Sequence, residues 1–161
     1  MDKQLEKLYQ NQIKNEWYSA YFYLSMAAYF ESENFEGFAH WMKKQASEEY
    51  GHGQKMFDFL LDRGVKVVLQ AIPQPPADFA SALEVFEKTL EHEQKVTALI
   101  NGIADASDKV NDRPSKVFIQ WFVTEQVEEE KNATKIVEML RKMKPESGAI
   151  WQLDHRLGKR E

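Results

Sequence analysis

The chain has no cysteine among its 161 residues. This absence excludes disulfide bonds, zinc fingers and the cysteine-ligated iron sites of rubredoxin-type domains, and it favours an intracellular location. Residues 1–4 also lack the basic start and the apolar core of a signal peptide. We therefore expect a cytoplasmic protein.

Long hydrophobic runs and basic stripes are absent as well. The most apolar stretch, residues 17–30, is too short and too rich in Tyr and Ser to span a bilayer. The net charge is −5, and without a basic tail or stripe nucleic-acid binding is not expected. An acidic surface attracts cations, although many proteins share that charge. The length predicts one domain, residues 1–161, with ample core.

Proline is scarce, and three of the 5 prolines fall close together, at positions 73, 75 and 76. Apolar residues recur elsewhere at steps of three and four, which predicts helices at about residues 2–32, 35–63, 79–107, 113–144 and 147–157. The extended linker between the second and third helices reaches roughly 46 Å at ~3.3 Å per residue. That matches the roughly 43 Å length of the helix before it. The fold class is therefore all-α, a four-helix bundle with one long crossover and a short fifth C-terminal helix.

Each long helix has an apolar seam that is interrupted by acidic or polar residues. The interrupting residues are Glu16 in the first helix, Glu49 and His52 in the second, Glu93 in the third, and Gln126 and Glu129 in the fourth. The two residues of the second helix follow Glu16 by 33 and 36 positions, and those of the fourth follow Glu93 by the same intervals. Burying a carboxylate costs several kcal/mol unless a cation meets it. The repeated spacing therefore predicts a shared partner, and a metal ion is the obvious one.

The heights of these residues along the bundle also agree. In each half, the outer members lie 18 positions on either side of an expected turn, near Asn34 in the first half and near Asn111 in the second. At about 1.5 Å of rise per residue, all six side chains should meet in one layer. Four carboxylates, one imidazole and one amide do not suit zinc, but they suit two iron or manganese ions that share bridging carboxylates. Two Fe²⁺ ions can jointly deliver two electrons to O₂ or peroxide.

Four segments carry a resemblance to a known family. They are residues 16–19 (EWYS), 35–38 (FEGF), 48–52 (EEYGH) and 121–130 (WFVTEQVEEE). Through them the chain resembles the bacterial non-haem ferritins, over essentially its whole length. The resemblance implies iron storage and detoxification by a homo-oligomeric shell of 24 subunits around a ferric mineral, with Fe²⁺ oxidised to Fe³⁺ by O₂ or H₂O₂ at a di-iron ferroxidase centre.

The resemblance also implies roles for individual residues. Glu16, Glu49 and His52 would hold the first iron, with Glu49 bridging, and Glu93 and Glu129 would hold the second. Gln126 would order water or O₂ nearby. A third iron site would use Glu48, Glu125 and Glu128, with Glu129 between sites. Tyr23 and Trp121 match aromatic residues that can supply an electron.

Two departures separate the chain from related families. Bacterioferritins have a second Glu-x-x-His motif where this chain has Gln126 and Glu129, and they place a haem-ligating Met where Tyr50 stands here. We therefore predict no haem. Rubrerythrins need a cysteine-bound iron domain, and the DNA-binding mini-ferritins lack the fifth helix, so both fit poorly.

Several alternatives stay open at the level of sequence. The polar layer could fix helix register in a structural or interaction protein, as buried polar groups do in coiled coils. The acids of the third site could form a solvated face, and Tyr23 and Trp121 could be core aromatics. Gln45 is polar on the same seam and has no assigned role. The fifth helix is expected at a subunit interface, and we interpret His40, His92 and His155 as surface or interface residues.

Overall fold

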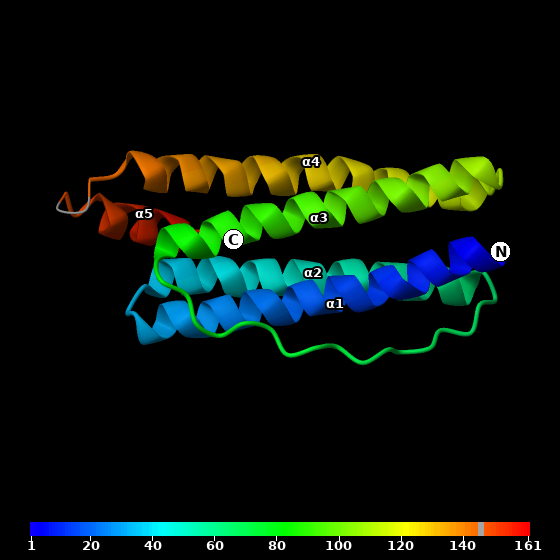
Figure 1. Cartoon of the computed structure of the whole chain (residues 1–161), viewed down its shortest axis with the longest axis horizontal. Helices are drawn as coiled ribbons and strands as arrows, with labels where there is room; N and C mark the ends of the chain where they lie inside the picture. Colours follow the sequence, from blue (N-terminus) through cyan, green and yellow to red (C-terminus); the bar gives the residue numbers. More distant parts are fainter. Residues whose placement is uncertain (145–146) are drawn as a thin grey trace.

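The computed structural model describes residues 1–144 and 147–161, and the described residues form helices without a strand. The helices are α1 (Lys3–Ser32), α2 (Glu36–Asp62), α3 (Ala82–Lys109), α4 (Arg113–Lys142) and α5 (Ala149–Leu157). Four long helices lie side by side and α5 lies at one end of them (Figure 1). The predicted all-α bundle with a short fifth helix is confirmed. None of the described helices has the length and apolar composition to cross a bilayer.

The ends of the helices follow capping chemistry. α3 begins at Ala82 rather than near residue 79, because the Ser81 hydroxyl accepts a hydrogen bond from the Glu84 N–H at 3.1 Å. α4 ends at Lys142, two residues earlier than predicted. The predicted end of the helix, near residue 144, borders Pro145, which lies outside the described residues.

Both short turns lie where the sequence predicts them. Asn34 and Asn111 have φ angles of 61° and 54°. The left-handed region strains most side chains, but Asn enters it with less strain because its short polar side chain can hydrogen-bond locally. Each turn therefore reverses the chain within a few residues and joins two antiparallel helices.

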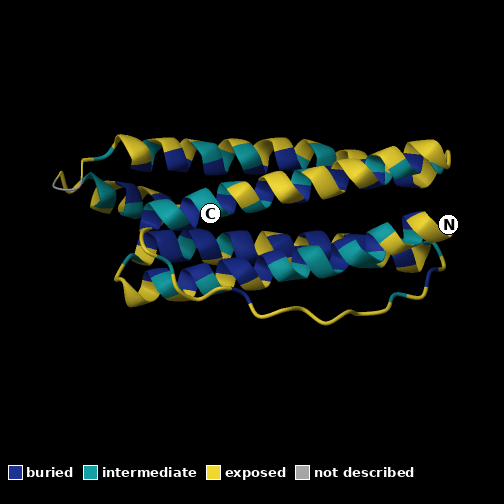
Figure 2. Ribbon diagram, in the orientation of Figure 1, coloured by how far each residue is buried: buried dark blue, intermediate teal, exposed yellow. Residues whose placement is uncertain are grey.

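The connection between α2 and α3 runs the length of the bundle beside α1 (Figure 1). Hydrogen bonds tie it to α1: the Val68 N–H donates to the Gln10 side chain at 2.9 Å, and the Ser25 hydroxyl donates to the Pro76 carbonyl at 2.6 Å. The connection is mostly exposed (Figure 2). The connection brings the chain back to the end of the bundle at which α2 begins. α3 therefore runs parallel to α2, as expected for a bundle with one long crossover.

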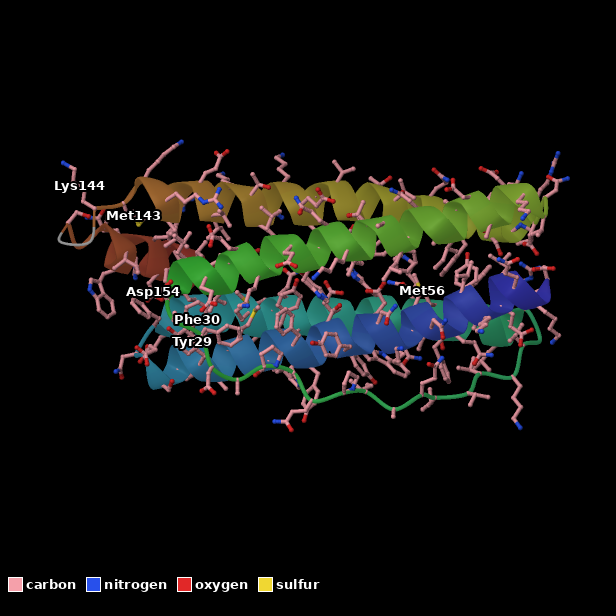
Figure 3. The ribbon with its side chains drawn as sticks, viewed as in Figure 1. Tyr29, Phe30, Met56, Met143, Lys144 and Asp154 are labelled. Carbon is pink, nitrogen blue, oxygen red and sulfur yellow. The ribbon has the colours of Figure 1, made fainter. Side chains whose placement is uncertain are left out.

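The hydrophobic core is divided into two clusters along the bundle. One cluster is built around Phe30, Phe38 and Phe86, and the other contains Met56 and Ile100. Phe30 and Met56 lie toward opposite ends of the bundle (Figure 3). The inward faces of the helices are buried along most of their length (Figure 2). The buried stretch between the clusters is polar.

α5 packs against the core of its own chain. Leu153 and Leu157 are 4% and 9% exposed and belong to the core cluster of their own chain, so a subunit interface is not what buries them. The Asp154 carboxylate accepts a hydrogen bond from the Phe38 N–H at 2.8 Å, in the first turn of α2. Gly37 permits this contact, because a Cβ there would lie 1.8 Å from the Asp154 carbonyl oxygen. The sequence did not predict this packing, because a one-dimensional pattern does not show the open end of the bundle. Contact of α5 with another subunit stays a prediction, and Trp151 remains 54% exposed on the helix.

Candidate metal centre

Six side chains from four helices form a buried polar layer between the two core clusters. Its acids and its imidazole are nearly inaccessible, with exposed fractions from 1% for Glu16 to 7% for His52. The members are Glu16 of α1, Glu49 and His52 of α2, Glu93 of α3, and Gln126 and Glu129 of α4. We call this set the carboxylate layer.

One half of the layer is arranged to hold a cation. Glu16, Glu49 and His52 each offer a ligand atom, and these atoms lie within 4.8 Å of one another. The His52 Nδ1 lies 3.6 Å from the Glu49 Oε2 and 4.0 Å from the Glu16 Oε2. Among the described residues, that Glu16 oxygen is buried without a hydrogen-bond donor. A buried acceptor without a partner is costly, and a metal ion would satisfy it, so these residues fit a hard, oxygen-preferring metal.

A second group within the same reach contains His52, Glu125 and Glu129. Of the three acids predicted for a third iron site, Glu125 therefore approaches the layer. Glu48 belongs to neither of the two groups; it is exposed and forms an ion pair with Arg160. Glu128 is exposed and is likewise outside both groups.

The other half of the layer is held by hydrogen bonds. The Tyr23 hydroxyl donates to the Glu93 Oε1, and the Gln126 Nε2 donates to the Glu93 Oε2 at 3.2 Å. Glu93 belongs to neither group of potential ligands, and these donors engage both of its oxygens. Trp121 is 39% exposed and packs edge-on to the His52 ring at a centroid distance of 5.3 Å. Tyr23, which is fully buried, is thus the closer of the two aromatic residues to a layer carboxylate.

Burial makes the layer difficult to ionise. Desolvation, reinforced by neighbouring carboxylates, raises the pKa of Glu16 and of Glu49 well above the ordinary value for Glu. Desolvation also raises the pKa of Glu93 and of Glu129 to about 7. In Glu129 the negative charge of Glu93 adds to the effect. A divalent cation would remove both causes, since it replaces the lost hydration and offsets the repulsion.

Comparisons with known proteins agree with this geometry. The family model described as "Ferritin-like domain" matches residues 6–143. The chain belongs to the ferritin family.

The relatives match almost end to end. A bacterial non-heme ferritin of Bacteroides fragilis is 39% identical over 160 residues and covers 99% of each chain. One of Staphylococcus aureus is 34% identical over 160 residues, which are 99% of this chain and 96% of the relative. The structure of an open pore ferritin from the archaeon Archaeoglobus fulgidus has a TM-score of 0.98 and 42% identity, covering 100% of this chain and 98% of that one.

Two glutamines that support the ferritin layer were not predicted. Gln12 donates to the Glu16 Oε1 at 2.8 Å. Gln45 donates to the Glu129 Oε2 at 2.7 Å and to the Glu49 Oε1 at 3.3 Å. Each glutamine precedes a layer glutamate by four positions on its own helix, and the two are 33 positions apart. This spacing was the available signal, since residues four apart are neighbours on a helix face.

The three remaining histidines do not share one environment. His155 is exposed, as predicted. His40 contacts the backbone carbonyl of Arg160 at 2.7 Å. His92, predicted at the surface or an interface, is half-buried: its ring packs against Phe22 at a centroid distance of 5.1 Å, and its Nε2 lies 2.7 Å from the Ser19 hydroxyl. Burial lowers the pKa of His92 to about 4.

Proposed function

We propose that this ferritin oxidises Fe²⁺ to Fe³⁺ at the carboxylate layer, with O₂ or H₂O₂ as oxidant, and stores the product as a ferric mineral inside a shell of 24 subunits. The observation that carries the proposal is the buried group of Glu16, Glu49 and His52, with a carboxylate oxygen that has no donor among the described residues. The similarity to bacterial non-heme ferritins over the whole chain supports the storage role.

Iron is the substrate of this reaction. Two Fe²⁺ ions lose one electron each, and O₂ takes up the two electrons with two protons to give H₂O₂. A further pair of Fe²⁺ ions reduces H₂O₂, with two protons, to water. The carboxylates favour the oxidised product, because hard anionic oxygen binds the higher charge more strongly.

The chain's residues take distinct roles in this proposal. Glu16, Glu49 and His52 bind the first Fe²⁺, and Glu49 is shared with the second, which Glu93 and Glu129 bind. Gln126 holds Glu93 and is the near neighbour of the oxidant. We assign the Tyr23 hydroxyl, which is hydrogen-bonded to Glu93, as the donor of a fourth electron when three Fe²⁺ ions supply the other three and O₂ is reduced with four protons to two water molecules.

A third iron position is proposed at Glu125, together with His52 and Glu129, whose ligand atoms come within reach of one another. Glu48 and Glu128, which the resemblance adds to this site, are exposed and belong to neither group of potential ligands. Their participation would need a change in side-chain position.

The test is anaerobic addition of Fe²⁺ followed by O₂, with loss of chelatable Fe²⁺ and O₂ consumption as readouts. Replacing Glu49 and His52 together by Leu should abolish oxidation and stabilise the metal-free protein by about 1–4 kcal/mol, as other buried charged sites do. Glu138→Gln, at an exposed position of α4, should oxidise iron like the parent. A double variant that loses helicity and still oxidises iron would favour a polar layer that only fixes helix register. A subunit that sediments as a monomer or dimer would contradict the storage shell.

A further inference from the structure

Arg160, in the segment that follows α5, returns to the middle of α2. One guanidinium nitrogen donates to the Gln45 Oε1 at 2.9 Å and to the Trp41 carbonyl at 3.3 Å, and another donates to the Glu48 carboxylate. The guanidinium also lies over the Trp41 ring, 4.6 Å from its centroid. Its side chain is 21% exposed. Arg160 is therefore held on several sides, and Gln45 is its inward contact.

Gln45 connects this cation to the carboxylate layer. It is 1% exposed, and its Nε2 donates to Glu129 at 2.7 Å and to Glu49 at 3.3 Å. An amide has an acceptor end and a donor end. With Arg160, which only donates, on one side and two carboxylates, which only accept when ionised, on the other, a single amide orientation satisfies every contact.

We propose that Arg160 is a positioning residue for the metal layer and that it acts through Gln45 on the Glu129 carboxylate. The inference rests on the proposed function, in which Glu129 binds the second metal ion. Without the guanidinium, the Gln45 amide would lose the partner that turns its NH₂ group toward the layer. Glu129 would then be held less firmly in the position that binds metal.

The ion pair with Glu48 belongs to the same arrangement. Arg160 presents a planar fork of donors, so one terminal nitrogen of the guanidinium binds Glu48 while the other reaches Gln45. Glu48 thereby serves as the counter-ion that fixes the arginine. This accounts for its absence from the groups of acids that lie close enough to share a metal.

The experiment measures metal binding rather than iron oxidation. Co²⁺ is titrated into the full-length protein under anaerobic conditions, where it is not oxidised, while its d–d absorption is recorded. Arg160→Ala should weaken the weaker of two Co²⁺ sites about 10-fold, and Gln45→Leu about 10–100-fold, as loss of residues behind metal ligands does. Combining both changes should weaken Co²⁺ binding no more than Gln45→Leu alone does. Lys159→Ala, an exposed neighbour in the same segment, should bind like the parent.

The combined variant distinguishes positioning from a merely structural role. If Arg160→Ala weakens Co²⁺ binding equally with and without Gln45, the arginine acts by charge or by general stability, and the inference is wrong. If the Arg160→Ala protein binds two Co²⁺ ions as tightly as the parent does, the inference is also wrong while the proposed function stands. A parent that binds no Co²⁺ would overturn both. Should Arg160→Ala not fold, Arg160→Lys keeps the charge without the fork, and it should show a smaller loss at the same site that again disappears in the Gln45→Leu background.

Discussion

The metal-free protein should become less stable as the pH rises, and the carboxylate layer sets the size of the effect. Burial raises the pKa of Glu93 and of Glu129 from 4.5 to about 7. A carboxyl group with a raised folded-state pKa holds its proton more tightly in the folded protein. Its contribution to stability is therefore fully present below pH 4.5 and is lost as the pH rises through about 7. A difference of about 2.5 in pKa corresponds to about 3 kcal/mol for each group.

The two carboxyl groups repel each other when ionised, so their joint effect is about 3–6 kcal/mol. The double variant Glu93→Gln with Glu129→Gln cannot ionise at these two positions, so its stability should lack this contribution to the pH dependence. The measurement is denaturant unfolding in the presence of a chelator between pH 4.5 and pH 8, followed by helical circular dichroism. The quantity compared is the difference in unfolding free energy between parent and variant, followed as the pH changes, because other groups and shell assembly contribute to both proteins. Saturating Co²⁺ should restore the parent at pH 8. Equal pH profiles for parent and variant would refute the reasoning.

Three further predictions concern helix packing, a helix cap and a hydrogen bond to the carboxylate layer. Gly37→Ala should displace α5 and destabilise the subunit by about 1–3 kcal/mol, since its Cβ would meet backbone at 1.8 Å. The fluorescence of the α5 tryptophan reports this. Gly102→Ala in α3, with no atom within 4 Å, is the control without a clash and should stabilise the helix by about 0.5–1 kcal/mol. Asp112→Ala should cost about 1–2 kcal/mol in denaturant unfolding, more than Arg63→Ala, because the aspartate both pairs with the arginine at 2.8 Å and caps α4; equal losses would contradict the cap. Tyr23→Phe removes a donor to a layer carboxylate and should weaken Co²⁺ binding about 10-fold, whereas unchanged titrations would assign the tyrosine to packing alone.

The sequence was sufficient wherever the decisive contacts repeat along a helix. Interruptions of the apolar seams placed Glu16 and Glu93 at matching heights, and the two turn residues fixed that height. Capping moved the start of α3 by three residues from the predicted position, because the Ser81 hydroxyl and the Glu84 N–H decide it locally. Periodicity identifies the face of a helix well and its first residue poorly.

Contacts between distant residues escaped the same reasoning. Arg160 lies 115 positions from Gln45 and 112 from Glu48, and no spacing rule joins residues so far apart. The place of α5 was missed for a related reason: its apolar face was recognised, but the end of the bundle that receives it exists only in three dimensions. The family resemblance gave Glu48 as a ligand, whereas the charge nearest to it in this chain is an arginine.

The two core clusters explain how the fold tolerates a layer of buried acids. On one side Phe30 and Phe38 pack at a centroid distance of 5.1 Å, and on the other Phe59 and Phe118 stack at 3.9 Å. Apolar burial at both ends of the helices supplies the stabilisation, and the carboxylates occupy the stretch between, where each helix is already held from both directions. The carboxylates are therefore brought together by packing elsewhere and not by attraction to one another, because they repel one another once they ionise. A metal ion arriving at such a layer finds its carboxylates already assembled, so little ordering is left for binding to supply.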